Sequence, residues 1–154
     1  MRRYFSWMIL VALLLTASVM AAAKENAPAK YTVVEVKHLT VADGIDLPAE
    51  YLNGTYDKLR EELAKKGIFG TVAEEGGAIS DPGAVVLECK IVKFHSNGMT
   101  GGHVQVEVTL LSRGDRKLIQ QFITQEMQTN GGNWGNKSRV TGHYLAEEIK
   151  RNLR

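Results

Sequence analysis

Apolar and polar residues alternate most regularly along this chain between positions 103 and 111. Val104, Val106, Val108 and Leu110 occupy every second position of that run, which predicts a strand with one buried and one solvated face. Other runs rich in β-forming residues predict further strands over 31–41, 69–73, 84–95 and 116–127. The last of these is the most polar.

A helical period extends over 47–66. Its apolar positions recur at spacings of four, three and four residues, at Leu52, Tyr56, Leu59 and Leu63, and so form one stripe along a helix. Gly67 suits the residue that follows a helix C-terminus. Gly54 lies inside the helix, where glycine costs roughly 1 kcal/mol relative to alanine, so we expect a close packing contact there.

A second helix is predicted over 138–153, after a glycine-rich loop over 129–137. Ser138 or Thr141 is its expected N-cap, because a side-chain oxygen can accept a bond from the free N–H groups of the first turn. Its apolar face comprises Val140, Tyr144, Ile149 and Leu153, with Leu145 at the margin.

The order of these elements predicts an α+β fold. Three long consecutive strands joined by short turns form a meander, and two amphipathic helices need an apolar surface to cover. We therefore predict a two-layer sandwich, in which a mainly antiparallel sheet of four to five strands carries two helices packed on one face. Residues 31–154 form a single domain without an internal repeat.

The N-terminal segment, residues 1–23, has the layout of a bacterial secretory signal peptide. Arg2 and Arg3 precede an apolar run, and three alanines end it at Ala23, where the sequence changes abruptly to a polar segment. We expect cleavage near Ala23, a flexible lead-in over 24–30, and a periplasmic or secreted protein. The alternative is an uncleaved membrane anchor, since the segment is just long enough to span a bilayer.

Charge and cysteine content exclude several classes of protein. Loss of Arg2 and Arg3 with the signal leaves 17 basic and 17 acidic residues, and a neutral domain without a basic run is not a nucleic-acid binder. The single cysteine, Cys89, excludes an intramolecular disulfide framework. It lies in the apolar run 84–95, where we expect it to pack in the core.

No catalytic or cofactor-binding residues can be assigned. The sequence contains no G-x-S-x-G nucleophile motif, phosphate-binding loop or dinucleotide fingerprint. Adjacent carboxylates such as Glu61 and Glu62 point in different directions on a helix, and Glu74 with Glu75 lacks the aspartate ladder of a calcium loop. We therefore predict that the protein is not an enzyme.

Three residues are candidates for contact with a partner or ligand. His95 and His103 bracket a glycine-rich loop and can face each other across the base of a hairpin. With His38 they could in principle meet a metal, but no H-x-x-x-H pair supports such a site, and we predict none. Trp134 lies in the second glycine loop, where it either caps the sheet or contacts a partner.

Five segments together carry a resemblance to known proteins. They are YTVVEVKHLTV, LREELAKKGIFGTV, AVVLECKIVKF, VQVEVTLLSRGDRKLI and LAEEIKRNL, in that order over 31–153. This order resembles uncharacterised domains of the bacterial cell envelope, often lipoproteins. These domains are similar in turn to the periplasmic α+β domain of curli-secretion lipoproteins and to the amino-terminal domain of TolB. The resemblance implies a non-enzymatic role, although this chain lacks the lipid-bearing cysteine.

These observations predict an exported, non-enzymatic binding or assembly module whose partner is another envelope protein. The polar strand 116–127 could lie at a sheet edge and accept a strand of that partner. Two alternatives stay open. One is a small-ligand or metal-binding periplasmic protein that uses His38, His95, His103 or Trp134. The other is a hydrolase whose site forms only in three dimensions.

Overall fold

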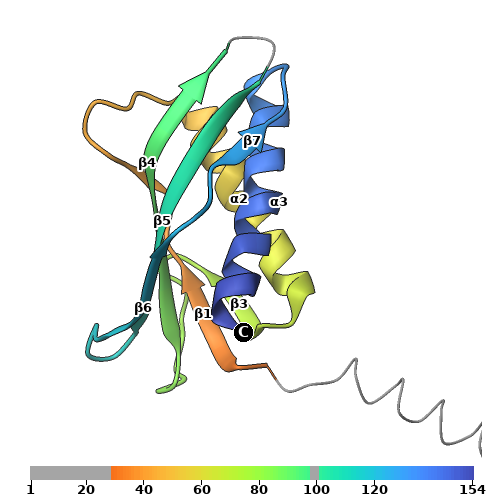
Figure 1. Cartoon of the computed structure of the whole chain (residues 1–154). Coiled ribbons are helices and arrows are strands. Elements are labelled where there is room, and N and C mark those ends of the chain that lie inside the picture. Colours follow the sequence, from red (N-terminus) through yellow and green to blue (C-terminus); the bar gives the residue numbers. More distant parts are fainter. Residues whose placement is uncertain (1–28, 98–100) are drawn as a thin grey trace, which may run out of the picture.

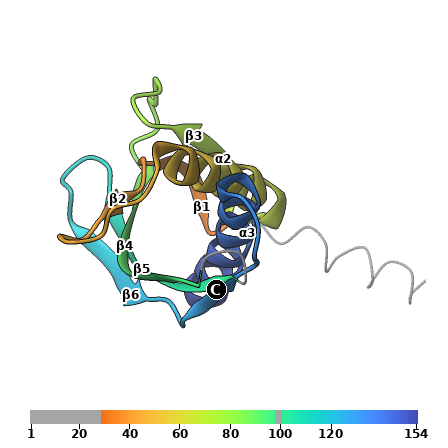
Figure 2. The ribbon, with the colours of Figure 1, turned by 90° about the horizontal axis from the view of Figure 1, so that it is seen from above.

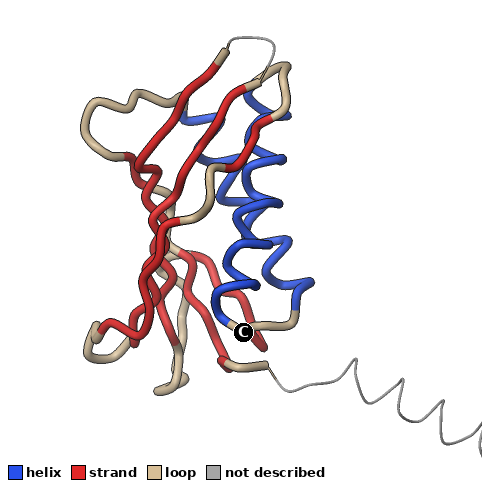
Figure 3. Tube along the Cα trace, in the orientation of Figure 1, coloured by secondary structure: helices blue, strands red, loops and turns tan. Residues whose placement is uncertain are grey.

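The computed structural model describes residues 29–97 and 101–154, and the predicted signal segment 1–23 lies outside them. The elements are β1 (Tyr31–Val36), β2 (Thr40–Val41), α2 (Ala49–Lys66), β3 (Phe69–Glu74), β4 (Val85–Ser96), β5 (Gly102–Ser112), β6 (Leu118–Ile123), β7 (Met127–Thr129) and α3 (Trp134–Leu153). One layer holds the sheet and the other holds both helices (Figures 1 and 3). Seen from above, the sheet curves around the core and the helices close its open side (Figure 2).

The described strands form one sheet in the order β3-β1-β4-β5-β6, with β2 beside β4 and β7 beside β5. The predicted α+β class is confirmed, but the sheet has seven strands rather than four to five, and it is mixed. β1 runs parallel to both β3 and β4, because helix α2 carries the chain back between β1 and β3 in a crossover. Only β4, β5, β6 and β7 form the predicted antiparallel part.

Two predicted strands are each divided in the structure. The run 31–41 becomes β1 and β2, and both lie against β4. The run 116–127 becomes β6 and β7, both paired with β5. Between these two strands the Thr124 hydroxyl, in place of a backbone carbonyl, accepts a hydrogen bond from the Val106 N–H. The extra strands therefore arise from interruptions of the expected ones.

The core fills the space between the sheet and the helices. The alternation predicted for β5 is confirmed, since Val104, Val106, Val108 and Leu110 are all buried. On α2, Tyr51 joins Tyr56, Leu59 and Leu63 in the core, whereas Leu52 is only half-buried. On α3 the buried apolar residues are Leu145, Ala146, Ile149 and Leu153. The predicted apolar residue Tyr144 is exposed.

Helices α2 and α3 lie parallel and pack closely through two glycines. A Cβ atom at Gly54 would collide with the Ser138 side chain, and one at Gly142 would lie 2.9 Å from the carbonyl oxygen of Thr55. The close contact predicted at Gly54 is thus confirmed. The Tyr51 and Thr141 hydroxyls form a buried hydrogen bond of 2.8 Å across the same interface.

The start of α3 differs from the prediction. Its N-cap is Asn133, whose side-chain oxygen accepts a hydrogen bond from the Asn136 N–H. Ser138 and Thr141 lie inside the helix, where their hydroxyls donate to carbonyls of the preceding turn. Trp134 therefore lies on the first turn of a helix rather than in a loop. In the described part of the chain, neither helix combines the length and apolarity of a membrane span.

Candidate functional site

Trp134 covers one end of the hydrophobic core. Its ring centroid lies 5.7 Å from that of Tyr51 and 6.1 Å from that of Phe94, and the Lys137 ammonium lies 4.8 Å from its centre. The indole is half-buried. Of the two roles considered for this residue, packing over the sheet is visible in the structure.

His95 and His103 face each other directly in the pairing of β4 with β5. Beside them, Lys93 forms a 2.6 Å ion pair with Glu126. His38 does not join them, because its Nδ1 lies 2.9 Å from a carboxylate oxygen of Glu75. Among the described residues, no three His, Cys, Asp or Glu side chains are grouped to hold a metal ion.

A buried carboxylate, Glu35, organises the face of the sheet opposite the helices. It accepts hydrogen bonds from the Lys37 ammonium at 2.8 Å, the Arg113 guanidinium at 2.9 Å and the Gly76 N–H at 3.1 Å. The Lys37 ammonium above all, with these other donors, lowers the pKa of Glu35 to about 2, although burial acts in the opposite direction. This network was not predicted from the sequence. Gly114 is sufficient to account for the turn that follows β5, so Arg113 suggested no role beyond that turn.

The neighbouring carboxylate, Glu75, is engaged as well. It accepts hydrogen bonds from the His38 N–H and ring, and these bonds, with Lys37, lower its pKa. The His38 ring in turn stacks on Tyr56 at 4.1 Å between centroids. A shallow cavity of about 370 Å³ adjoins this cluster. Since each carboxylate already holds cationic or N–H donors, the cluster ties a loop to the sheet.

A third carboxylate, Glu62, links the two helices. It pairs with Lys58 at 2.9 Å and with the His143 ring at 3.2 Å. The Lys58 ammonium and, more weakly, His143 lower the pKa of Glu62 to about 2 against the effect of burial. His143, for which the sequence suggested no partner, therefore has a structural contact across the helix interface.

Large apolar side chains are exposed along one margin of the molecule. Within the described residues these are Leu118, Ile119 and Ile123, which are 53%, 44% and 58% exposed, and Tyr144, which is 47% exposed. The first three belong to β6, the last strand in the sheet order. The prediction that strand 116–127 lies at an edge is confirmed. We refer to residues 118–126 as the β6 edge.

The β6 edge also presents free backbone groups. The Thr124 N–H donates to the Val106 carbonyl of β5 at 2.9 Å. Because backbone groups in an antiparallel pair point alternately toward and away from the neighbouring strand, those of Gln121 and Ile123 point away from β5. No charged residue and no proline occur from Leu118 to Gln125, although natural edge strands commonly carry such residues to prevent pairing.

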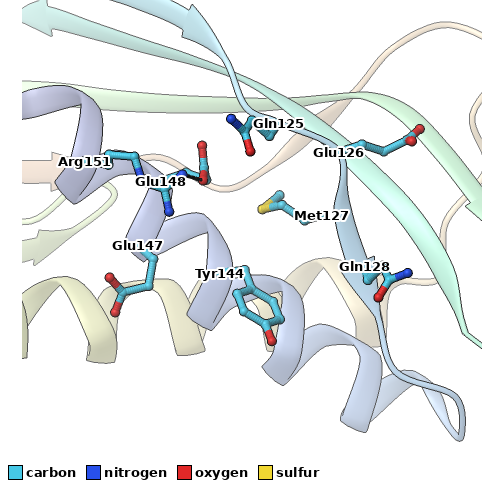
Figure 4. A pocket seen from close by; sticks show the side chains of 8 residues that line it. All are labelled: Gln125, Glu126, Met127, Gln128, Tyr144, Glu147, Glu148 and Arg151. Carbon is cyan, nitrogen blue, oxygen red and sulfur yellow. Dashed lines mark hydrogen bonds and ion pairs between the residues drawn. The ribbon is translucent and has the colours of Figure 1, made fainter.

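A cavity of about 390 Å³ lies beside the β6 edge, between residues 125–128 and helix α3. Figure 4 shows Met127 and Tyr144 on its two sides, with Glu148 and Arg151 at one end. Glu148 is ion-paired with Arg151 at 2.5 Å. The cavity is lined mostly by polar and charged side chains, whereas the β6 edge beside it exposes three large apolar ones.

Comparisons with known proteins identify relatives by structure and not by sequence. No family model matches the chain, and no curated protein matches it. PelC from Paraburkholderia phytofirmans, solved as a dodecamer, is similar with a TM-score of 0.56 and 14% identity, over 81% of this chain and 91% of that one. XCC0632 from Xanthomonas campestris, described by the family model DUF330, is similar with a TM-score of 0.51 and 13% identity, over 82% and 83%.

At these identities the likeness establishes the fold alone. The chain has the α+β fold of PelC and of XCC0632, a domain known by a DUF family model. The expected resemblance to uncharacterised bacterial domains is thus confirmed at the level of fold.

Proposed function

We propose that this chain is a non-enzymatic assembly module of the bacterial cell envelope, which binds another envelope protein through the β6 edge. The observation that carries the proposal is the exposure of Leu118, Ile119 and Ile123 on a strand with a free side. A partner strand placed there would bond to the free backbone groups of Gln121 and Ile123. Main-chain bonds of this kind supply affinity, and alternate side chains supply specificity.

The chemistry of the remaining candidates supports a role without catalysis. Glu35 and Glu62 are held ionised by cationic side chains and cannot exchange a proton near neutral pH. Burial raises the pKa of the Cys89 thiol to about 12, so this group is protonated and inert. None of these residues combines exposure to solvent with a pKa near neutrality, as a general base or nucleophile requires.

The likeness to PelC supports the assembly part of the proposal, because that protein was solved as a dodecamer. The signal-like segment 1–23 supports an envelope location. Intact-mass measurement of the protein from a periplasmic extract tests that location. We expect a mature chain that begins at Lys24, whereas a full-length chain found in the membrane fraction would contradict a periplasmic module.

Pairs of variants at Gln121 test the β6 edge itself. Gln121→Pro removes one outward N–H but spares the N–H groups that bond β5, and proline is tolerated at such positions of edge strands. Gln121→Val keeps the N–H and is the matched control. After in-cell crosslinking and purification, we expect the partner to be lost with Gln121→Pro and retained with Gln121→Val. Equal recovery with a folded Gln121→Pro chain would contradict the proposal.

A further inference from the structure

We propose that His95 of β4 and His103 of β5 together bind an exchangeable divalent transition-metal ion, with copper(II) bound most tightly. The site is a two-histidine pair on the face of the sheet that the helices do not cover. It is separate from the β6 edge and does not depend on the proposed function. Sequence patterns predicted no metal site at these residues, and the register of the two strands changes that prediction.

The two histidines are held directly opposite each other. Strands β4 and β5 are antiparallel, and His95 is the register partner of His103. Directly opposed residues of such a pair project from the same face, and their Cβ atoms lie about 4.5–5.5 Å apart. Both imidazoles can therefore turn toward one point above the sheet, where each would bond a metal ion at about 2.0–2.1 Å.

The backbone beneath the pair is fixed by the core. Phe94, next to His95, projects to the inner face, where its ring centroid lies 6.1 Å from that of Trp134. Val104, next to His103, is fully buried. The strands that carry the two histidines are thus anchored on the opposite face. A site whose ligands are already positioned loses less conformational freedom when it binds an ion.

The ring nitrogens of the pair are available to a ligand. Among the described residues, none forms a hydrogen bond or an ion pair with the imidazole of His95 or of His103. The other two histidines differ, because His38 and His143 each have a ring nitrogen beside a carboxylate oxygen, at 2.9 and 3.2 Å. His95 is exposed and His103 is half-buried. An ion from solvent can therefore reach both rings.

The charged and polar neighbours of the pair tolerate a cation. The Lys93 ammonium above all, and more weakly His103 and His95, lower the pKa of Glu126, so this carboxylate lies within electrostatic range of both rings. Glu126 also forms the 2.6 Å ion pair with Lys93, and it thereby offsets the positive charge nearest to the site. On β7, Gln128 is the register partner of His103, which puts an amide oxygen on the same face.

Two imidazole ligands select the class of ion. Imidazole suits copper, nickel and zinc, whereas calcium and magnesium prefer oxygen ligands. Copper(II) stands highest in the general order of affinity of divalent ions. Structural zinc sites use four protein ligands and catalytic ones use three. With two protein ligands, water fills the remaining positions, and the ion can be exchanged with another ligand.

Calorimetric titration of the full chain without a histidine tag tests the site, with Cu²⁺ alone as the probe. We expect one ion per chain. His95→Gln and His103→Gln should each weaken binding at least tenfold, because either change turns a two-point contact into a single one. The double variant should bind little more weakly than either single variant. His38→Gln is the matched control and should bind as the native chain does.

Electron paramagnetic resonance of the copper complex gives a second measurement. We expect two nitrogen ligands in the native chain and one in each single variant. Heat no greater than the blank with the native chain, or native affinity in either single variant, would overturn the inference. Losses that add up in the double variant would mean two independent imidazoles and would overturn it too. Both histidines lie on the outer face, so the variants should unfold near the native urea concentration.

Discussion

Ile123 of β6 lies opposite Glu107 of β5, on the face of the sheet that the helices do not cover. The Glu107 carboxylate lies on a solvated face of the sheet. Ile123, although apolar, is on the same face and is more than half exposed. Folding of the monomer gains little from an apolar side chain in this position. The Ile123 side chain is therefore available to a partner, and its replacement should affect binding more than folding.

Replacement of Ile123 by lysine should abolish binding of the partner protein at the β6 edge and leave the fold intact. The side chain is exposed, so the free energy of unfolding should change by no more than about 0.5 kcal/mol. A charge on an edge strand, however, opposes pairing with another strand. Recovery of the partner after in-cell crosslinking and urea unfolding measure the two effects. Thr71→Lys on β3 is the matched control and should bind the partner normally, and equal loss of the partner in both variants would count against the β6 edge.

The interface between the two helices should not tolerate side chains at its glycines. Gly142→Ala should lower the free energy of unfolding by about 1–3 kcal/mol, because the new Cβ atom would lie 2.9 Å from the carbonyl oxygen of Thr55. Gly114→Ala is the control, since a Cβ atom there would have no neighbour within 4 Å. Urea unfolding provides the measurement, and equal stability of both variants would refute close helix packing.

Glu35 should make the stability of the fold depend on pH. Its pKa is lowered from 4.5 to about 2 in the folded chain, so the folded state favours the ionised form. The resulting stabilisation is present above the unfolded pKa and is lost as the pH falls from about 4.5 to about 2. Glu35→Gln should lower the free energy of unfolding by about 1–3 kcal/mol at pH 7.

The difference between the native chain and Glu35→Gln should therefore shrink in urea titrations at progressively lower pH. Glu61→Gln provides the comparison, because the half-exposed Glu61 pairs with Lys58 and Lys65 on the helix surface, and such pairs contribute little. A stability difference for Glu35→Gln that stayed constant between pH 7 and pH 2.5 would show that the carboxylate charge is unimportant.

Cys89 should resist thiol reagents until the chain unfolds. The residue is buried, and burial raises the pKa of its thiol to about 12. Thiolate is the reactive form, so a chromogenic disulfide reagent at pH 8 should react in urea but not with the folded chain. Gln121→Cys adds an exposed thiol as the positive control. Rapid reaction of native Cys89 would contradict its position in the core.

Much of the fold could be predicted from the sequence, because local patterns report local structure. The alternation around Val106 and the stripe containing Leu59 and Leu63 correspond to elements of the structure. The parallel pairing of β1 with β3 and β4 could not be predicted, since it depends on how the α2 crossover packs. Nor could the start of α3, because Asn133 and Ser138 are both acceptable caps and tertiary packing selects between them.

The candidate surface was visible from the sequence only in part. The polar character of 116–127 suggested an edge, and β6 is one. The exposure of Ile119 and Ile123 was hidden, because apolar residues in a strand ordinarily indicate burial. The absence of charge from 118 to 125 was the signal that could have identified the unprotected edge. By contrast, the partners of Glu35 come from distant segments and left no pattern in the sequence.

Photo-crosslinking from single positions in living cells tests the role of the β6 edge most directly. A benzophenone amino acid would be placed at Ile123, and in a parallel strain at Lys90, which is exposed on the same face in β4. The account predicts a discrete crosslinked protein adduct from position 123 and none from position 90. An adduct from position 90 alone, or from neither position, would contradict an assembly role for this edge.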